Sequence, residues 1–262
     1  MTARSRFTRL LGAGAMLALA YLILPLAVVV PVSLTDQRML SLPVDGLSLQ
    51  HYETVFSSSV WLSSAGQSLL IGALSMALAL AIGTWSAIGC WMLGERRSGF
   101  FRVVNLLPVV VPSIIYALGA YRLFVDIGLF DTVLGVVLVH AVGAIPFVFI
   151  VISTSLAFVD LSLMRAARSL GAGMLRAAVL VVLPNIKTGL ASAAIFAFLH
   201  SWDEVVVTLF VSSTAVHTLP RKMWEGLSEN LDPTIACVAV VMVLLTLVLL
   251  LLQQRAKGPS AG

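Results

Sequence analysis

Residues 132–158 read TVLGVVLVHAVGAIPFVFIVISTSLAF, a run that contains no Asp, Glu, Lys or Arg. About 20 consecutive apolar residues are enough for an α-helix to cross the hydrocarbon core of a bilayer. The run is continuously apolar instead of alternating, so we expect a helix and not a strand of a membrane β-barrel. This stretch therefore places the chain among integral membrane proteins.

Five further apolar runs flank this one, and their limits are expected to hold to within a few residues. The six runs cover residues 10–32, 65–93, 103–124, 132–158, 188–211 and 234–252. Of the 262 residues, 60% are hydrophobic and only 11% are charged, whereas about a quarter of the residues in soluble domains are charged. The polar segments between the runs are too short to form a soluble core of their own. We predict an all-α, polytopic membrane protein with about six transmembrane helices in a single domain.

The basic residues indicate how these helices are oriented. Six spans place both ends of the chain on one side of the membrane, and cytoplasmic loops carry an excess of Lys and Arg. With the N-terminus inside, the inner segments hold 12 of the 16 basic residues and 2 of the 12 acidic ones, which gives a net charge of +10 inside and −6 outside. This asymmetry predicts a multi-pass protein of the inner (plasma) membrane with cytoplasmic N- and C-termini. It also explains the high pI of about 9.4 without a nucleic-acid partner.

The inner segment after the fourth run, residues 160–187, reads DLSLMRAARSLGAGMLRAAVLVVLPNIK. Asp160 can cap a helix that starts at Leu161, and Gly171 can end it. A second helical stretch, residues 174–183, is expected to stop at Pro184. By composition alone the segment is typical of an amphipathic helix that lies on lipid headgroups.

The spacing within this segment resembles the "EAA" loop of ABC-importer permeases. That pattern is Glu-Ala-Ala, three residues, Gly, nine residues, then an aliphatic residue, any residue and Leu-Pro. The resemblance implies that the loop docks into a groove of a cytoplasmic ATPase subunit. Arg165 stands where the family has glutamate, so a cation replaces an anion at this contact. The polar contacts of docking therefore differ from those of the family. The residues that the resemblance assigns to this coupling loop are Asp160, Arg165, Ala166, Ala167, Gly171, Leu183 and Pro184.

The resemblance extends over residues 61–255, a shared importer core of the methionine-importer type, which one extra N-terminal span precedes. Within the family, the chain is most similar to the second permease of spermidine/putrescine importers. Permeases for thiamine, ferric iron and phosphonates share many of the same features. The resemblance implies three partners: a second permease subunit, expected to be a different chain, a cytoplasmic ATPase dimer and a periplasmic substrate-binding protein. It implies no cofactor, and the chain lacks the Gly-x-x-x-x-Gly-Lys-Ser/Thr loop of an ATPase.

Two adjacent acids interrupt the fifth run, because Asp203 and Glu204 are followed by further apolar residues. A carboxylate inside the bilayer core costs about 3 kcal/mol or more on insertion scales, so such groups face a bundle interior or a water-filled cavity. His200 lies three and four residues earlier, so we expect all three side chains to share one helix face. These residues predict a substrate pathway that attracts cations. Two alternatives stay open: the acids pair with a basic residue of the partner subunit, or the helix ends earlier and leaves them in an outer vestibule.

Three other residues complete the candidate pathway. Trp202 and Tyr116 could supply an aromatic ring to a cationic substrate. His140 in the fourth run is a further candidate, with an interhelical hydrogen bond as the alternative. Pro108 and Pro112 are expected to bend the third run.

Two other classes of function fit the sequence less well than a permease does. An intramembrane enzyme would use His140, His200, Asp203 and Glu204 as metal ligands or acid–base groups, but the chain lacks a His-Glu-x-x-His motif. A secondary carrier would show an internal repeat, and none is clear. Both cysteines lie within apolar runs and are expected to be buried hydrophobic residues, so neither a disulfide nor a metal site is predicted.

Overall fold

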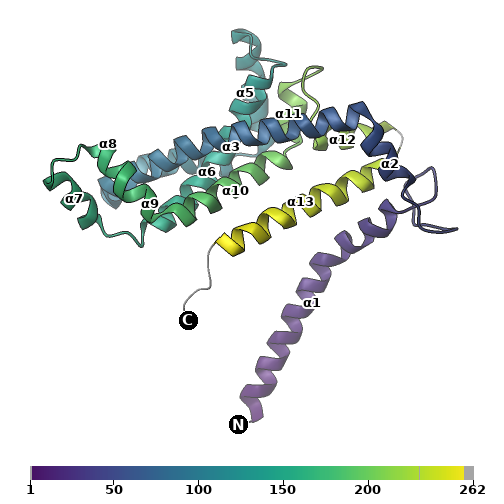
Figure 1. Cartoon of the computed structure of the whole chain (residues 1–262), viewed down its shortest axis with the longest axis horizontal. Helices are drawn as coiled ribbons and strands as arrows, with labels where there is room; N and C mark the ends of the chain where they lie inside the picture. Colours follow the sequence, from purple (N-terminus) through teal and green to yellow (C-terminus); the bar gives the residue numbers. More distant parts are fainter. Residues whose placement is uncertain (1, 230, 257–262) are drawn as a thin grey trace. The chain divides into compact units, whose positions relative to one another are not determined.

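The computed structural model describes residues 2–229 and 231–256. Every regular element in this part of the chain is a helix (Figure 1). The helices are α1 (Thr2–Ser33), α2 (Gln50–Ser57), α3 (Ser59–Leu93), α4 (Glu95–Val110), α5 (Ser113–Ile127), α6 (Val133–Leu156), α7 (Leu161–Ser169), α8 (Met174–Ala177), the π-helical turn η1 (Ala178–Val182), α9 (Leu183–Asn185), α10 (Lys187–Trp202), α11 (Val206–Val211), α12 (Leu219–Glu229) and α13 (Thr234–Ala256).

Four of these helices, α1, α3, α6 and α13, are long and apolar enough to cross a membrane singly. Two bent pairs meet the same criteria together: α4 with α5, at 100°, and Met174–Asn185 with α10, at 83°. Counting each bent pair as one span gives six, so the predicted all-α, polytopic fold is confirmed. Lys257, which the charge count assigned to the inner side, lies outside the described residues.

The chain forms two compact units. The first comprises Met1–Leu62 and Glu225–Leu245, and the second comprises Ser63–Trp224 and Thr246–Gly262. In the first unit, Oγ of Ser33 at the end of α1 lies 2.8 Å from the hydroxyl of Tyr52 on α2. The thiol of Cys237 donates a hydrogen bond to the carbonyl of Ser33 at 3.2 Å, so this buried cysteine is a free thiol, as is Cys90.

The core of the second unit is a close packing of α3, α6 and α10. Helices α6 and α10 run side by side (Figure 1). Glycines permit the contact: a Cβ at Gly83 of α3 would lie 2.7 Å from Cγ1 of Val148 on α6, and a Cβ at Gly189 of α10 would collide with the side chain of Ser155 on α6. Close approach at small residues is the usual way in which helices associate in lipid. It fixes the register of α6 against α10, the two helices that carry the site.

The third apolar run is divided between α4 and α5. Val111 is extended (φ −79°, ψ 126°), the conformation that a following proline imposes. Pro112 therefore bends the chain, as predicted, whereas Pro108 lies inside α4.

The fifth run is also broken, and the prediction of one helical face for His200, Asp203 and Glu204 is wrong. Helix α10 ends at Trp202, Asp203 is non-helical (φ −103°, ψ 1°), and α11 begins at Val206. The physical reason is a side-chain cap: Oε1 of Glu204 accepts a hydrogen bond from the backbone N–H of Val207 at 3.0 Å. That bond satisfies a donor at the start of α11, so the carboxylate starts a new helix instead of continuing the old one.

The inner loop contains the first helix that the sequence predicted, but its second helical stretch differs from the prediction. Asp160 caps α7 by accepting a hydrogen bond from the N–H of Ser162 at 2.7 Å. Gly171 has a positive φ of 87° where the chain leaves α7. The second helical stretch does not stop at Pro184, because the π-turn η1 leads into α9 with the proline in its first turn. A proline there has no backbone donor to lose.

Candidate functional site

A pocket of about 270 Å³ forms where the break between α4 and α5 meets the break between α10 and α11. The α4–α5 break supplies Pro108 to Ser113, and α5 supplies Tyr116. Helix α6 supplies Gly143 and Phe147, and the α10–α11 region supplies His200 and Glu204. Backbone that leaves the helical conformation at membrane depth is tolerated where it lines a cavity or is covered by protein. The two breaks therefore have a common consequence, which is a cavity between α5, α6 and α10.

His200 approaches α6 at a glycine, where no side chain obstructs it. A Cβ at Gly143 would collide with Nε2 of His200 and would lie 3.1 Å from the hydroxyl of Tyr116. The ring of His200 also lies over Phe147, with 5.2 Å between ring centroids and 36° between planes. Its buried Nε2 has no hydrogen-bond partner within the described part of the chain. This nitrogen is enclosed against Gly143, so the ring of His200 forms part of the pocket wall while its Nε2 stays covered.

Glu204 is half-buried and is the only acidic residue that lines this pocket. One carboxylate oxygen caps α11 through Val207; the other accepts no hydrogen bond in the described part of the chain. Together with the phenol oxygen of Tyr116 and the Phe147 ring, it makes a surface that suits an alkylammonium group. Among the described residues, no Lys or Arg lines the pocket. With a carboxylate and no such cation in its described lining, the site suits a cation better than an anion.

The structure does not bring all the predicted pathway residues together. His200, Glu204 and Tyr116 line the pocket, whereas Asp203 is exposed and lies outside it. Trp202 is 3% exposed and stacks on Phe198 of its own helix, with ring centroids 5.7 Å apart.

His140 is fully buried between helices and does not reach the pocket. Its Nδ1 lies 2.7 Å from Oγ of Ser201, and its Nε2 lies 3.0 Å from Oγ1 of Thr208. Both ring nitrogens are therefore engaged, one with α10 and one with α11. These contacts are the interhelical hydrogen bonds that were the alternative to a pathway role for His140. It ties the two halves of the broken span to α6.

Sequence reasoning missed Asp131, which organises the outer loop after α11. Its Oδ1 accepts hydrogen bonds from the hydroxyl of Ser212 at 2.6 Å and from the N–H groups of Ser213, Thr214 and Ala215 at 2.8–3.0 Å. The hydroxyls of Ser213 and Thr214 donate to Oδ2. Burial acts to raise the pKa of Asp131, but these hydrogen bonds outweigh it and hold that pKa well below its usual range. The Ser-Ser-Thr sequence was the available signal, since such residues fold around a nearby acceptor.

The coupling-loop residues gather at the end of α10 that is remote from the pocket. Arg165 and Ala166 are exposed on α7, Ala167 is half-buried and Met164 is buried. At the C-terminal end of α7, Leu170 is 90% exposed. Hydrogen bonding to Ser162, with a smaller effect of the nearby Arg165 charge, keeps the pKa of Asp160 below its ordinary value. The loop thus combines a capped amphipathic helix with an uncovered leucine, which suits a protein groove.

Within residues 2–229 and 231–256, no three side chains from His, Cys, Asp and Glu lie close enough together to hold a metal ion.

Curated relatives of similar length are transport permeases and not enzymes. The chain is 27% identical over 235 residues to the spermidine/putrescine transport system permease protein PotC of Haemophilus influenzae, covering 90% of this chain and 91% of that one. It is 28% identical over 238 residues to the putrescine permease PotI of Escherichia coli strain K12, covering 87% and 83%. It is 27% identical over 244 residues to the putative 2-aminoethylphosphonate permease PhnV of Salmonella typhimurium, covering 92% and 91%.

Solved structures share the fold at low sequence identity. A chain of a bacterial ABC transporter that imports alginate matches with a TM-score of 0.70 at 15% identity, covering 99% of both chains. A chain of the MetNI methionine ABC transporter matches with a TM-score of 0.61 at 19% identity, covering 74% of this chain and 93% of that one. The sequence model for binding-protein-dependent transport system inner membrane components matches residues 79–256. This chain therefore belongs to that family of importer permeases.

Proposed function

We propose that this chain is a pathway subunit of an ATP-driven importer of polyamines such as spermidine and putrescine. The observation that carries the proposal is the pocket in which Glu204, Tyr116, His200 and Phe147 surround a space whose described lining contains no Lys or Arg. Carboxylate, hydroxyl and aromatic groups are the partners that an alkylammonium ion requires. Relatives named for spermidine and putrescine transport, PotC and PotI, support the same substrate class.

The charge pattern supports an orientation with both termini in the cytoplasm of a cell with an inner membrane. In this orientation α7–α9 lie inside and the Asp131 loop lies outside. The capped, amphipathic α7 would then dock in a cytoplasmic ATPase dimer, with Leu170 buried in its groove. The outer surface would meet a substrate-loaded periplasmic binding protein. An alginate importer in complex with its pentasaccharide-bound periplasmic protein shares the fold, with a TM-score of 0.68 at 13% identity and coverage of 96% of this chain and 93% of that one.

A second permease subunit, expected to be a different chain, would close the pathway on its open side. ATP binding would bring the inner loops of the two permeases together and switch the pair between two conformations. In this arrangement the whole chain is one permease domain, with the shared importer core over residues 61–255 and α1 as an added span.

A second candidate substrate is an aminophosphonate, because the PhnV relative is named for 2-aminoethylphosphonate. A phosphonate is recognised by Arg, Lys or backbone N–H groups. The absence of Lys and Arg from the described pocket lining favours the polyamine.

The test is ATP-driven uptake in membrane vesicles that contain the complete transporter with its own binding protein. We expect labelled putrescine and spermidine to accumulate with ATP and not without it, and excess unlabelled 2-aminoethylphosphonate to leave their uptake unchanged. Uptake of 2-aminoethylphosphonate with no uptake of either polyamine would overturn the substrate class. Polyamine uptake that needs no ATP would overturn the importer type.

A further inference from the structure

A second pocket, of about 370 Å³, lies nearer the coupling loop between α6, α10 and the end of α13. Its lining combines apolar side chains with uncharged polar ones, and among the described residues it holds no Asp, Glu, Lys or Arg. The residues that line it are Ile150, Val151, Thr154, Ser155, Thr188, Gly189, Ser192, Phe196 and Gln253.

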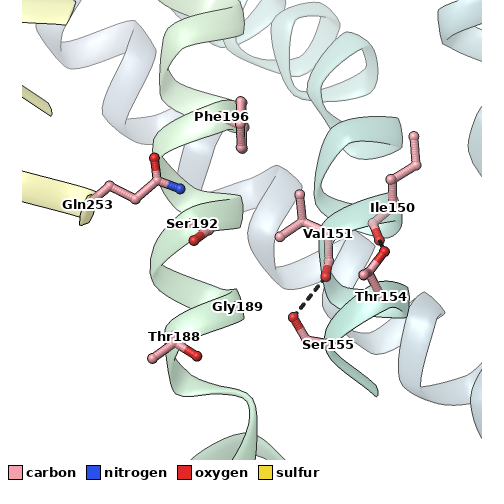
Figure 2. Close-up of a pocket in the computed structure, with 9 residues that line it drawn as sticks. All are labelled: Ile150, Val151, Thr154, Ser155, Thr188, Gly189, Ser192, Phe196 and Gln253. Atoms are coloured by element: carbon pink, nitrogen blue, oxygen red, sulfur yellow. Dashed lines mark hydrogen bonds between the residues drawn. The ribbon is translucent and has the colours of Figure 1, made fainter. Parts of the chain in front are cut away.

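Two of the lining side chains are buried and have no partner. Ser192 is 6% exposed and Gln253 is 8% exposed. Neither hydroxyl nor amide makes a hydrogen bond within the described part of the chain. Figure 2 shows Gln253 extending from α13 toward α10 at the level of Ser192. The polar atoms of both side chains are not among the fully buried ones, so they stay accessible at the pocket wall and can hydrogen-bond to water or to a polar ligand there.

The opposite wall of the pocket offers acceptors. On α6 the hydroxyl of Thr154 donates to the carbonyl of Ile150 at 2.9 Å, and the hydroxyl of Ser155 donates to the carbonyl of Val151 at 2.9 Å (Figure 2). Because each hydroxyl hydrogen is used by the backbone, the oxygen lone pairs are left to accept. The free hydrogen-bonding capacity on this wall is therefore that of an acceptor, which suits an N–H donor.

The two pockets lie along the same pair of helices. On α6, Phe147 of the outer pocket and Ser155 of the inner pocket are eight residues apart. On α10, His200 of the outer pocket and Ser192 of the inner pocket are also eight residues apart. At 1.5 Å per residue, both separations are about 12 Å along the helix. The same two helices thus line one pocket with a carboxylate and, about 12 Å further along, one without.

We propose that the inner pocket is a second binding site for the alkylammonium substrate, from which the substrate leaves toward the cytoplasm. The inference rests on the proposed function, because it assumes a cationic cargo. Glu204 attracts the ammonium group by charge, whereas Ser192, Ser155 and Gln253 offer only neutral dipoles. A permeation site must bind well enough to be entered and weakly enough to be left. Neutral oxygens at the inner end satisfy the second condition, since a dipole holds a cation less strongly than a carboxylate does.

The test is substrate protection of single cysteines in the complete transporter. In a Cys90→Ala, Cys237→Ala background, Gln253→Cys and Ser192→Cys are exposed in inside-out vesicles to a cationic methanethiosulfonate reagent, with and without excess putrescine. Leu252→Cys is the matched control, because this neighbour of Gln253 does not line the pocket. We expect both pocket cysteines to react and putrescine to slow each reaction about threefold or more, as an occupied site would. The control rate should not depend on putrescine.

The outcomes separate the two proposals. Polyamine uptake by the cysteine-free background, together with pocket cysteines that do not react or that putrescine does not protect, would overturn the inner site alone. Absence of polyamine uptake would overturn the proposed function and this inference with it. Gln253→Glu supplies an independent measurement: a carboxylate at the exit should lower the maximal uptake rate about fivefold or more without raising KM. Wild-type uptake by Gln253→Glu would contradict the proposal.

Discussion

His200 on α10 packs against Gly143 on α6 so closely that any Cβ at Gly143 would collide with its Nε2. Gly143→Ala should therefore push the imidazole into the outer pocket and lower polyamine uptake about tenfold. The control is Gly89→Ala on α3, where a Cβ has nothing within 4 Å. Uptake per assembled transporter checks both variants, and equal uptake by the two would show that the contact has no bearing on transport.

The exposed leucine at the end of α7 should be covered by the ATPase. Leu170→Glu would bring an unpaired carboxylate into an apolar groove, so co-purification of the ATPase subunit should fall about tenfold or more. Leu47→Glu changes a leucine that is also exposed, at 73%, in a predicted outer segment, and should leave association unchanged. If Leu170→Glu retains full association, α7 does not dock through this residue.

The Asp131 carboxylate should stabilise the outer loop equally at pH 5 and at pH 8. Because its folded pKa lies below the value of about 3.9 in an unfolded chain, its contribution is complete above that value and is lost as pH falls through the folded pKa. Asp131→Ala should lower the Tm of the purified transporter by about 3 °C or more, equally at pH 8 and pH 5. Asp126→Ala, which removes only an exposed ion pair with Arg122, should change the Tm little. A Tm difference that grows between pH 8 and pH 5 would contradict this account.

His140 should act on stability rather than on substrate affinity. His140→Leu leaves the hydroxyls of Ser201 and Thr208 without their partner, which should cost about 1–2 kcal/mol of stability. The apparent KM for polyamine should stay within about twofold of wild type. Uptake as a function of substrate concentration, measured beside thermal unfolding, separates the two effects. A large rise in KM with an unchanged Tm would return His140 to the pathway.

The sequence predicted the fold class and the family from features that are local. Continuous apolar runs predict spans because a helix in lipid satisfies its own backbone. The spacing from Ala166-Ala167 through Gly171 to Leu183-Pro184 predicted the permease family, and the match of the family over residues 79–256 confirms it. The Asp160 cap was also predicted from the sequence, because helix capping depends only on a residue and its near neighbours in the chain.

The geometry of the site could not be predicted in the same way, because it depends on which helices meet. Glu204 starts α11 by bonding to Val207, and no periodicity distinguishes that from a carboxylate on a continuous helix. The role of Gly143 depends on His200, which is 57 residues away in the sequence. The partners of Asp131 are similarly distant. One alternative for Asp203 and Glu204 was a helix that ends before them, and α10 does end at Trp202.

The most direct test of the central claim compares the two acids one at a time in ATP-driven putrescine uptake by the complete transporter. Glu204→Gln keeps an oxygen that can cap α11 through Val207 but removes the charge from the pocket, while Asp203→Asn removes a charge outside the pocket lining. We predict that Glu204→Gln raises KM about tenfold or more and that Asp203→Asn stays within about twofold of wild type. Wild-type uptake by an assembled Glu204→Gln transporter would contradict a cation pathway through this pocket.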